Sequence, residues 1–158
     1  MSNVQSVSIL FPVTVRERVI EQHRTLRELL HHALDATTRA LQPAGPNRDE
    51  LSRLVYELRS RFRAHLAFEE LHLAPVLANL DLWGPERVQD LIEEHARQRA
   101  ELETLVDGID GDWDAGRLAL ALRSLTTDLL LDMEEEEKGC LSADLLRDEM
   151  IIVGSLRD

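Results

Sequence analysis

The sequence predicts an all-α fold, namely an antiparallel, up-down-up-down four-helix bundle followed by a short C-terminal tail. Leu, Ala, Glu and Arg are abundant among the 158 residues, whereas glycine, proline and aromatic residues are scarce, and this composition favours helix over sheet. Apolar residues recur every three or four positions in four long segments, as on one face of an amphipathic helix. The breaks between these segments are short, and short connections favour antiparallel neighbours in a bundle.

Each expected helix is delimited by residues that start or stop helices. We expect helices at about residues 13–41, 47–73, 85–106 and 114–138. The second begins at a capping box, with Asn47 as the cap and Glu50 three residues later, and Pro75 is expected to kink or end it. Pro85 suits the first turn of the third helix, and Gly139 ends the fourth.

The chain is organised around this one bundle. We expect an N-terminal extension at residues 1–12, the bundle at residues 13–139 and a tail at residues 140–158. A net charge of −12 repels phosphates, so nucleic acid is not expected as a partner. No apolar run is long enough for a membrane span, and the single cysteine, Cys140, cannot form an internal disulfide. Together these features predict a cytoplasmic protein.

On every expected helix, the inward-facing apolar stripe gives way to a histidine or a carboxylate. The six residues concerned are His23 on the first helix, His65 and Glu69 on the second, His95 on the third, and Asp132 and Glu136 on the fourth. Burying such groups without partners is costly, about 2–7 kcal/mol even for a neutral polar group. In an antiparallel bundle their positions all fall near one end, so we expect them to converge in one layer.

These residue types predict a metal site, because imidazole and carboxylate donors together suit iron, manganese or zinc. The pairs His65/Glu69 and Asp132/Glu136 are each spaced four residues apart, so the members of a pair share a helix face. Glu69 and Glu136 come from different helices and are natural bridges between two ions. Residues expected to support the ligands from outside are Glu70, Glu94, Arg99 and Glu137. The remaining histidines, His31, His32 and His72, are expected at the periphery.

The motifs resemble those of a known family. Residues 65–70, read as His-Leu-Ala-Phe-Glu-Glu, and the pair Glu94-His95 are similar to the second and third helices of hemerythrin-like, HHE cation-binding domains. That family carries one His on the first helix, His-x-x-x-Glu on the second, His on the third and His-x-x-x-Glu on the fourth. The sequence matches at His23, His65, Glu69, His95 and Glu136, over roughly residues 13–140. Asp132 stands where the fourth motif has its histidine.

The resemblance implies a centre of two iron ions, with an oxo or hydroxo bridge as one of its forms and with manganese or zinc as second choices. Oxygen-carrying hemerythrins have a second histidine four residues after the third-helix ligand, where this chain has Arg99. Fewer imidazoles and more carboxylates stabilise ferric iron, which disfavours reversible oxygen carriage. We therefore expect handling of peroxide, oxygen, nitric oxide or iron in stress protection, with a peroxidase-, catalase- or ferroxidase-like activity.

Two other functions remain open from the sequence. One is a sensor or binding module for oxygen or iron that has no turnover. The other is a metal-free helical interaction protein, and a homodimer is a further expected partnership. Metal content separates the metal-free protein from the other two, and peroxide turnover separates the enzyme from the sensor.

The last eight residues resemble a docking signal. Residues 151–158 are similar to the C-terminal loading peptide of encapsulin cargo proteins, whose core is apolar-x-Val/Ile-Gly-Ser-Leu-Lys/Arg. The residues that would dock on the shell protein are Ile151, Val153, Gly154, Ser155, Leu156 and Arg157. Hemerythrin-like proteins are among the cargo classes of such shells, so the resemblance implies a location inside an encapsulin nanocompartment. The alternative is an amphipathic segment at residues 142–153 that folds back on the bundle.

Overall fold

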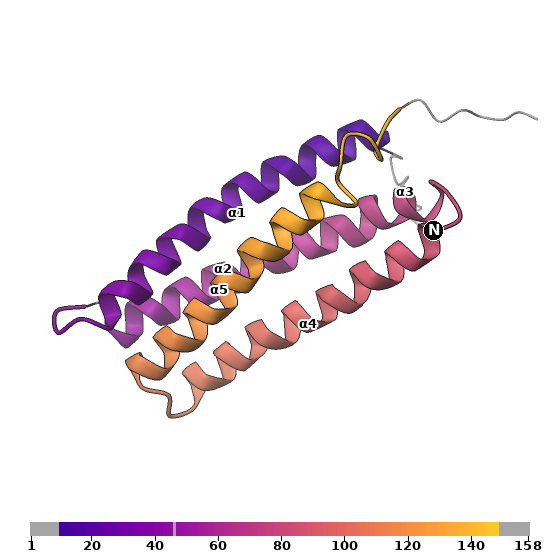
Figure 1. Ribbon diagram of the computed structural model, residues 1–158. Helices are drawn as coiled ribbons and strands as arrows, with labels where there is room; N and C mark the ends of the chain where they lie inside the picture. Colours follow the sequence, from indigo (N-terminus) through magenta and orange to yellow (C-terminus); the bar gives the residue numbers. More distant parts are fainter. Residues whose placement is uncertain (1–9, 46, 149–158) are drawn as a thin grey trace, which may run out of the picture.

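The computed structural model describes residues 10–45 and 47–148, and this part of the chain is helical without a strand. The elements are α1 (Pro12–Ala40), α2 (Arg48–Phe68), the π-helix η1 (Glu69–Leu73), α3 (Ala74–Ala78), α4 (Gly84–Asp110) and α5 (Ala115–Lys138). The four long helices lie side by side (Figure 1). The loops after α1 and α4 lie at one end of the molecule, and the loop between α3 and α4 lies at the other. The predicted all-α helical bundle is confirmed.

Local signals explain most helix boundaries. Asn47 caps α2, because its side chain accepts a hydrogen bond from the Glu50 N–H at 3.0 Å. Asp114 caps α5 in the same way. Helix α4 continues to Asp110, four residues past its expected end, because Gly108 is helical and buried beside the ring of Trp113.

The helix that was expected to kink or end near Pro75 instead changes type before it. Phe68 ends the α-helical hydrogen bonding of α2, and η1 follows directly, with the Ala74 N–H donating to the Glu69 carbonyl five residues earlier. Proline has no N–H to donate, so a normal turn here would leave a carbonyl without a partner. The wider turn lets the chain stay helical to Ala78.

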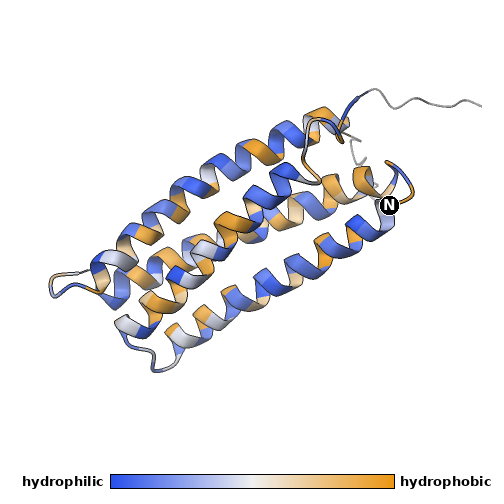
Figure 2. Ribbon diagram, in the orientation of Figure 1, coloured by the Kyte–Doolittle hydropathy of each residue, from blue (hydrophilic) through white to orange (hydrophobic). Residues whose placement is uncertain are grey.

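Two apolar cores lie along the bundle, and the predicted polar layer lies between them. The larger core includes Leu26, Leu58, Phe62, Leu102 and Leu122. The smaller core consists of Val15, Val19, Leu73, Ala74, Leu77, Leu91, Leu141 and Leu146. In Figure 2, apolar residues recur along each long helix between hydrophilic ones, as amphipathic helices require. Each core closes one side of the polar layer, which restricts access of water to it.

Residues 140–148, expected as part of a tail, pack on the bundle. Leu141 and Leu146 are 0% and 1% exposed and belong to the smaller core. The Arg16 Nε–H donates to the Leu141 carbonyl at 2.7 Å, and the Val13 N–H donates to Asp148 at 3.0 Å. The two leucines cover apolar residues of α1 that would otherwise face water. Residues 149–158, which include all of the expected docking residues, lie outside the described residues.

No helix in the described part of the chain has the length and apolar character needed to cross a bilayer.

Candidate metal centre

Glu69 lies at the middle of the polar layer, and three imidazole nitrogens surround its carboxylate. Its Oε1 is 3.3 Å from His65 Nε2 and 3.7 Å from His23 Nε2. Its Oε2 is 2.9 Å from His95 Nε2. The two oxygens therefore face histidines from different helices.

The outer nitrogens of two histidines are held by side chains from outside the centre. His23 Nδ1–H donates to Glu137 Oε1 at 2.8 Å, and Arg27 donates to the same oxygen at 2.7 Å. His65 Nδ1–H donates to the Gln22 side-chain oxygen at 2.8 Å. A proton on Nδ1 leaves the Nε2 lone pair available, so both rings present a metal-binding atom to the interior.

The third histidine is supported in the same way. His95 Nδ1–H donates to Glu70 Oε1 at 3.0 Å. Arg99 forms a two-pronged ion pair with Glu70, with N–O distances of 2.7 and 3.0 Å. Arg99 stands where oxygen-carrying hemerythrins have a second histidine. Here it holds Glu70, which in turn holds His95.

A cation fits the arrangement of the inner atoms. His23, His65, Glu69 and Glu136 each offer one ligand atom, and these four atoms lie within 4.8 Å of one another. In the described part of the chain, His23 Nε2 and Glu69 Oε1 are both buried without a hydrogen-bond partner. Leaving such an atom unsatisfied costs about 1–3 kcal/mol. A metal ion between them would satisfy both.

Without a cation, the centre holds its protons unevenly. Burial opposes charge on His23, but the carboxylates of Glu136 and Glu69 outweigh it and raise its pKa to about 9. Burial lowers the pKa of His65 to about 4, although Glu69 lies beside it. Burial alone would raise the pKa of Glu69, but the nearby rings of His23 and His95 lower it to about 2. Protonated, positively charged His23 therefore lies against the negatively charged Glu69.

The side of Glu69 that faces His95 is richer in carboxylates. A small cavity of about 10 Å³, close to the volume that one water molecule needs, lies there. It is lined by Phe62, His65, Leu66, Glu69, Glu94, His95, Gln98, Asp132, Met133 and Glu136. Burial, Asp132 and Glu136 together raise the pKa of Glu94 to about 7.

The structure does not bring all six expected ligands into one cluster. Asp132 and His95 lie outside the group of four, although both line the cavity. Asp132 Oδ2 accepts hydrogen bonds from Arg97 at 2.8 Å and from Gln98 at 3.1 Å. Glu70, Arg99 and Glu137 lie where supporting residues were expected.

Sequence reasoning missed several residues that support this centre. They are Gln22 on α1, Arg27 on α1, and Arg97 and Gln98 on α4. Gln98 carried a usable signal, because it follows His95 by three positions on the inward face of α4 and is only 5% exposed. Gln22 carried none, since its role depends on the distance between α1 and α2.

The peripheral residues behave differently from the ligands. His31 and His32 are exposed, and the His72 ring lies tilted against Phe68, with ring centres 4.6 Å apart. The Cys140 sulfur is 4.0 Å from Glu136 Oε1, and burial together with the carboxylates of Glu136 and Glu69 raises the pKa of this thiol. A protonated thiol is a poor nucleophile.

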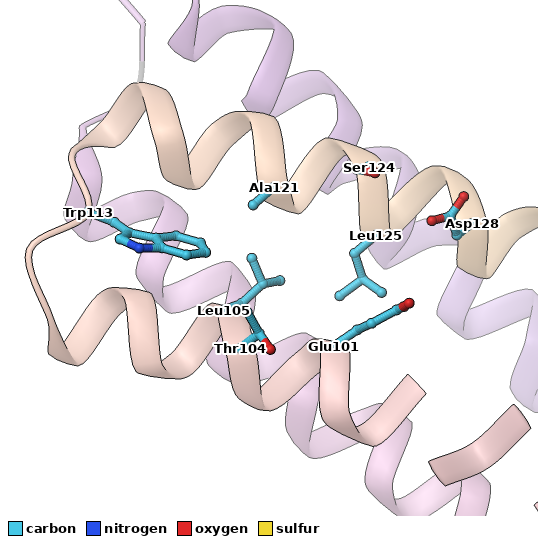
Figure 3. A pocket seen from close by; sticks show the side chains of 8 residues that line it. All are labelled: Glu101, Thr104, Leu105, Trp113, Ala121, Ser124, Leu125 and Asp128. Carbon is cyan, nitrogen blue, oxygen red and sulfur yellow. The ribbon is translucent and has the colours of Figure 1, made fainter. Parts of the chain in front are cut away.

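A larger groove of about 270 Å³ lies between α4 and α5, toward the loop that joins them (Figure 3). Its lining residues are Glu101, Thr104, Leu105, Trp113, Ala121, Ser124, Leu125 and Asp128. The Trp113 ring closes the loop end, and Leu105 and Leu125 extend into the space between the helices. No histidine lines this groove, so its donor set does not match that of the polar layer.

The comparisons with known proteins agree with the donor set. No match was found among curated proteins or among solved structures. The family model of the hemerythrin HHE cation binding domain matches residues 14–143, a range that contains every residue of the polar layer. The chain therefore belongs to the hemerythrin HHE cation-binding domain family.

Proposed function

We propose that the chain is a non-haem di-iron protein whose two ions lie on either side of Glu69. The first ion would be bound by the Nε2 atoms of His23 and His65, by Glu69 Oε1 and by Glu136. The second would be bound by His95 Nε2, Glu69 Oε2 and Asp132. The observation that carries this proposal is the contact of each Glu69 oxygen with a different set of histidines. The antiparallel, up-down-up-down order of the helices is part of the proposal, because it brings all these residues to one level.

The donor chemistry favours iron. Three imidazoles and at least three carboxylates form a mixed, anionic donor set. Such a set suits iron better than zinc, whose structural sites have four ligands and often include thiolates. Carboxylates stabilise the ferric state, so the proposed role is redox handling of peroxide, oxygen, nitric oxide or iron itself, and not reversible oxygen carriage. Bound iron would supply one-electron chemistry and a coordination position for a small molecule. The chain contributes the orientation of the imidazoles and two apolar cores that limit entry of water.

Elemental analysis tests the metal assignment. The purified full-length chain is loaded anaerobically with ferrous iron, desalted and analysed for iron, manganese and zinc. We expect about two iron atoms per chain, followed by turnover of peroxide or of nitric oxide in a stopped-flow assay. A chain that stays metal-free, or takes up zinc alone, would overturn the di-iron proposal. Two bound iron atoms without any turnover would favour the sensor.

We also propose that the chain is cargo of an encapsulin shell. The support is the similarity of residues 151–158 to a loading peptide. In cells that co-express an encapsulin shell protein, the full chain should co-purify with assembled shells, whereas a chain lacking residues 149–158 should not. Leu156→Asp should act like the deletion, because a carboxylate in an apolar groove is costly. If the deleted chain still enters the shell, the cargo proposal is wrong.

A further inference from the structure

We propose that Glu94 is a ligand of the second metal position, beside Asp132, and that Gln98 is the positioning residue that holds both carboxylates there. The inference rests on the proposed di-iron centre and adds a ligand to it. The sequence pattern had assigned Glu94 only a supporting role next to His95.

The second position needs more donors than the family's motif leaves it in this chain. Asp132 replaces the histidine of the fourth motif, and Arg99 stands where oxygen carriers have a second imidazole. On this side the chain supplies one imidazole, from His95, and one oxygen of Glu69. With Asp132 and Glu94 added, the second position has four protein donors. The first position also has four, from His23, His65, Glu69 and Glu136.

Glu94 lies at the right place for this role. It precedes His95 on α4, is half-buried, and lines the same small cavity as Glu69, Asp132 and Glu136. Glu94, Asp132 and Glu136 also line an open groove of about 200 Å³ between α4 and α5. The proposed second position is therefore enclosed on the Glu69 side and reachable from solvent on the other.

The hydrogen bonds of Glu94 and Asp132 leave one oxygen of each carboxylate free. Gln98 is 5% exposed, and its side-chain N–H group donates to Glu94 Oε1 at 3.2 Å and to Asp132 Oδ2 at 3.1 Å. The ion pairs with Arg97 also go to these two oxygens, at 3.9 and 2.8 Å. Among the described residues, Glu94 Oε2 and Asp132 Oδ1 have no hydrogen-bond partner.

The histidines show the same arrangement, in which one atom of the side chain is held by a hydrogen bond and the other is left for a metal ion. There, the outer Nδ1 atom of each ring is held by a side chain, and the inner Nε2 atom faces Glu69. Here, Gln98 and Arg97 contact one oxygen of each carboxylate, and the second oxygen has no hydrogen-bond partner. Placing the carboxylates of Glu94, Asp132 and Glu136 beside one cavity is unfavourable without a cation between them. Gln98 is neutral, so it orients two of these carboxylates without neutralising the charge that binds the ion.

Cobalt(II) is a suitable probe, because it is redox-stable in air and its visible absorption reports the coordination number. The full-length protein is titrated with cobalt(II) by calorimetry and by absorption. We expect two ions per chain in two resolved steps. Glu94→Gln keeps the shape of the side chain and should weaken the second step by at least about tenfold, with a changed absorption spectrum and an unchanged first step. Gln98→Met should also weaken the second step, by about tenfold.

Glu135→Gln is the matched control. Glu135 is exposed, lines the same open groove and carries the same charge, but it does not line the inner cavity. If Glu135→Gln weakens the second step as much as Glu94→Gln does, Glu94 acts only through its charge and the inference is wrong. If Glu94→Gln and Glu94→Ala both bind two ions with wild-type affinities, the inference is wrong but the metal centre stands. If the wild-type chain binds no cobalt and no iron, the proposed function itself fails.

Discussion

At the residue scale, one carboxylate organises the centre. Glu69 is 1% exposed. Its Oε1 faces His65 of α2, and its Oε2 faces His95 of α4. Burial would raise its pKa, but the nearby rings of His23 and His95 lower it to about 2, so Glu69 is ionised at neutral pH. A buried anion that needs two histidines to stabilise it is a strong site for a cation.

Glu69→Gln should remove both metal positions, because an amide oxygen is a weak donor and cannot bridge two ions as a carboxylate does. Metal content after anaerobic iron loading measures this. Glu70→Gln is the comparison, since the only residue of the proposed metal centre that Glu70 contacts is His95, at its outer nitrogen. We expect Glu70→Gln, which also weakens the ion pair with Arg99, to weaken the second position alone, by about 10–100-fold. Equal loss of both ions in the two variants would contradict a bridging role for Glu69.

Metal binding should release a proton from His23. Its pKa of about 9 lies above the ordinary value of 6.5, so the folded, metal-free chain carries this proton at neutral pH. An ion can bind His23 Nε2 only after the proton leaves, so metal affinity should rise with pH until the pH passes about 9. His65, with a pKa of about 4, should release none.

The stability of the metal-free chain follows the same linkage. The contribution of protonated His23 to the free energy of unfolding is complete below the unfolded pKa of 6.5 and is lost as the pH rises through about 9.

Calorimetry of metal binding in buffers of different ionisation enthalpy counts the protons that the chain releases when the metal binds. We expect about one proton from His23, together with part of one from Glu94 at its pKa of about 7. Proton release that persists unchanged in His23→Ala would contradict this assignment.

At the scale of elements, the π-helix η1 shapes the centre. Glu69 and Glu70 are its first two residues, and they contact opposite nitrogens of the same ring, His95. Such wide turns are costly and occur often at functional sites. The π-helix directly precedes α3, in whose first turn Pro75 lies, so the proline that has no N–H to donate follows the segment that carries the two carboxylates.

The contact between α4 and the following loop makes a stability prediction. A Cβ atom at Gly108 would lie 2.3 Å from Cδ2 of Trp113, so Gly108→Ala should destabilise the protein by about 1–3 kcal/mol through overpacking. Thermal or denaturant unfolding measures this. At Gly116 in α5, a Cβ atom would meet only Asp114 Oδ1 at an ordinary 3.5 Å. Gly116→Ala should therefore stabilise by up to about 1 kcal/mol, since alanine is the better helix former. A neutral Gly108→Ala would mean that Trp113 moves aside freely.

At the scale of the whole molecule, the polar layer divides the interior into two apolar cores. The smaller core is completed by Leu141 and Leu146, which follow the last helix. The segment after α5 packs against α1, so it forms part of the wall around the polar layer.

Two truncations test this closure. Deleting residues 149–158 should leave the melting temperature and the metal content unchanged. Deleting residues 140–158 removes Leu141 and Leu146, which are both fully buried. The loss of each leucine should lower the free energy of unfolding by about 1.5–3 kcal/mol. Thermal unfolding of both chains, with iron content measured alongside, makes the comparison. An equal loss in the shorter deletion would show that residues 149–158 contribute to the fold.

The sequence by itself determined where the helices lie and which histidine and carboxylate side chains face the interior. Hydrophobic spacing and the Asn47 cap depend on residues within a few positions of one another, so they can be read locally. The same spacing placed His23, His65 and Glu69 on buried faces.

Only the tertiary structure decided which atoms meet. The contact between His65 and Gln22, the hydrogen bond from Gln98 to Asp132, and the burial of Leu141 all join residues from different helices or from a helix and a following segment. Helical periodicity states which face a side chain occupies, but not how far a neighbouring helix lies or which oxygen of a carboxylate turns toward it. Those distances are set by the packing of whole helices, which depends on every side chain between them.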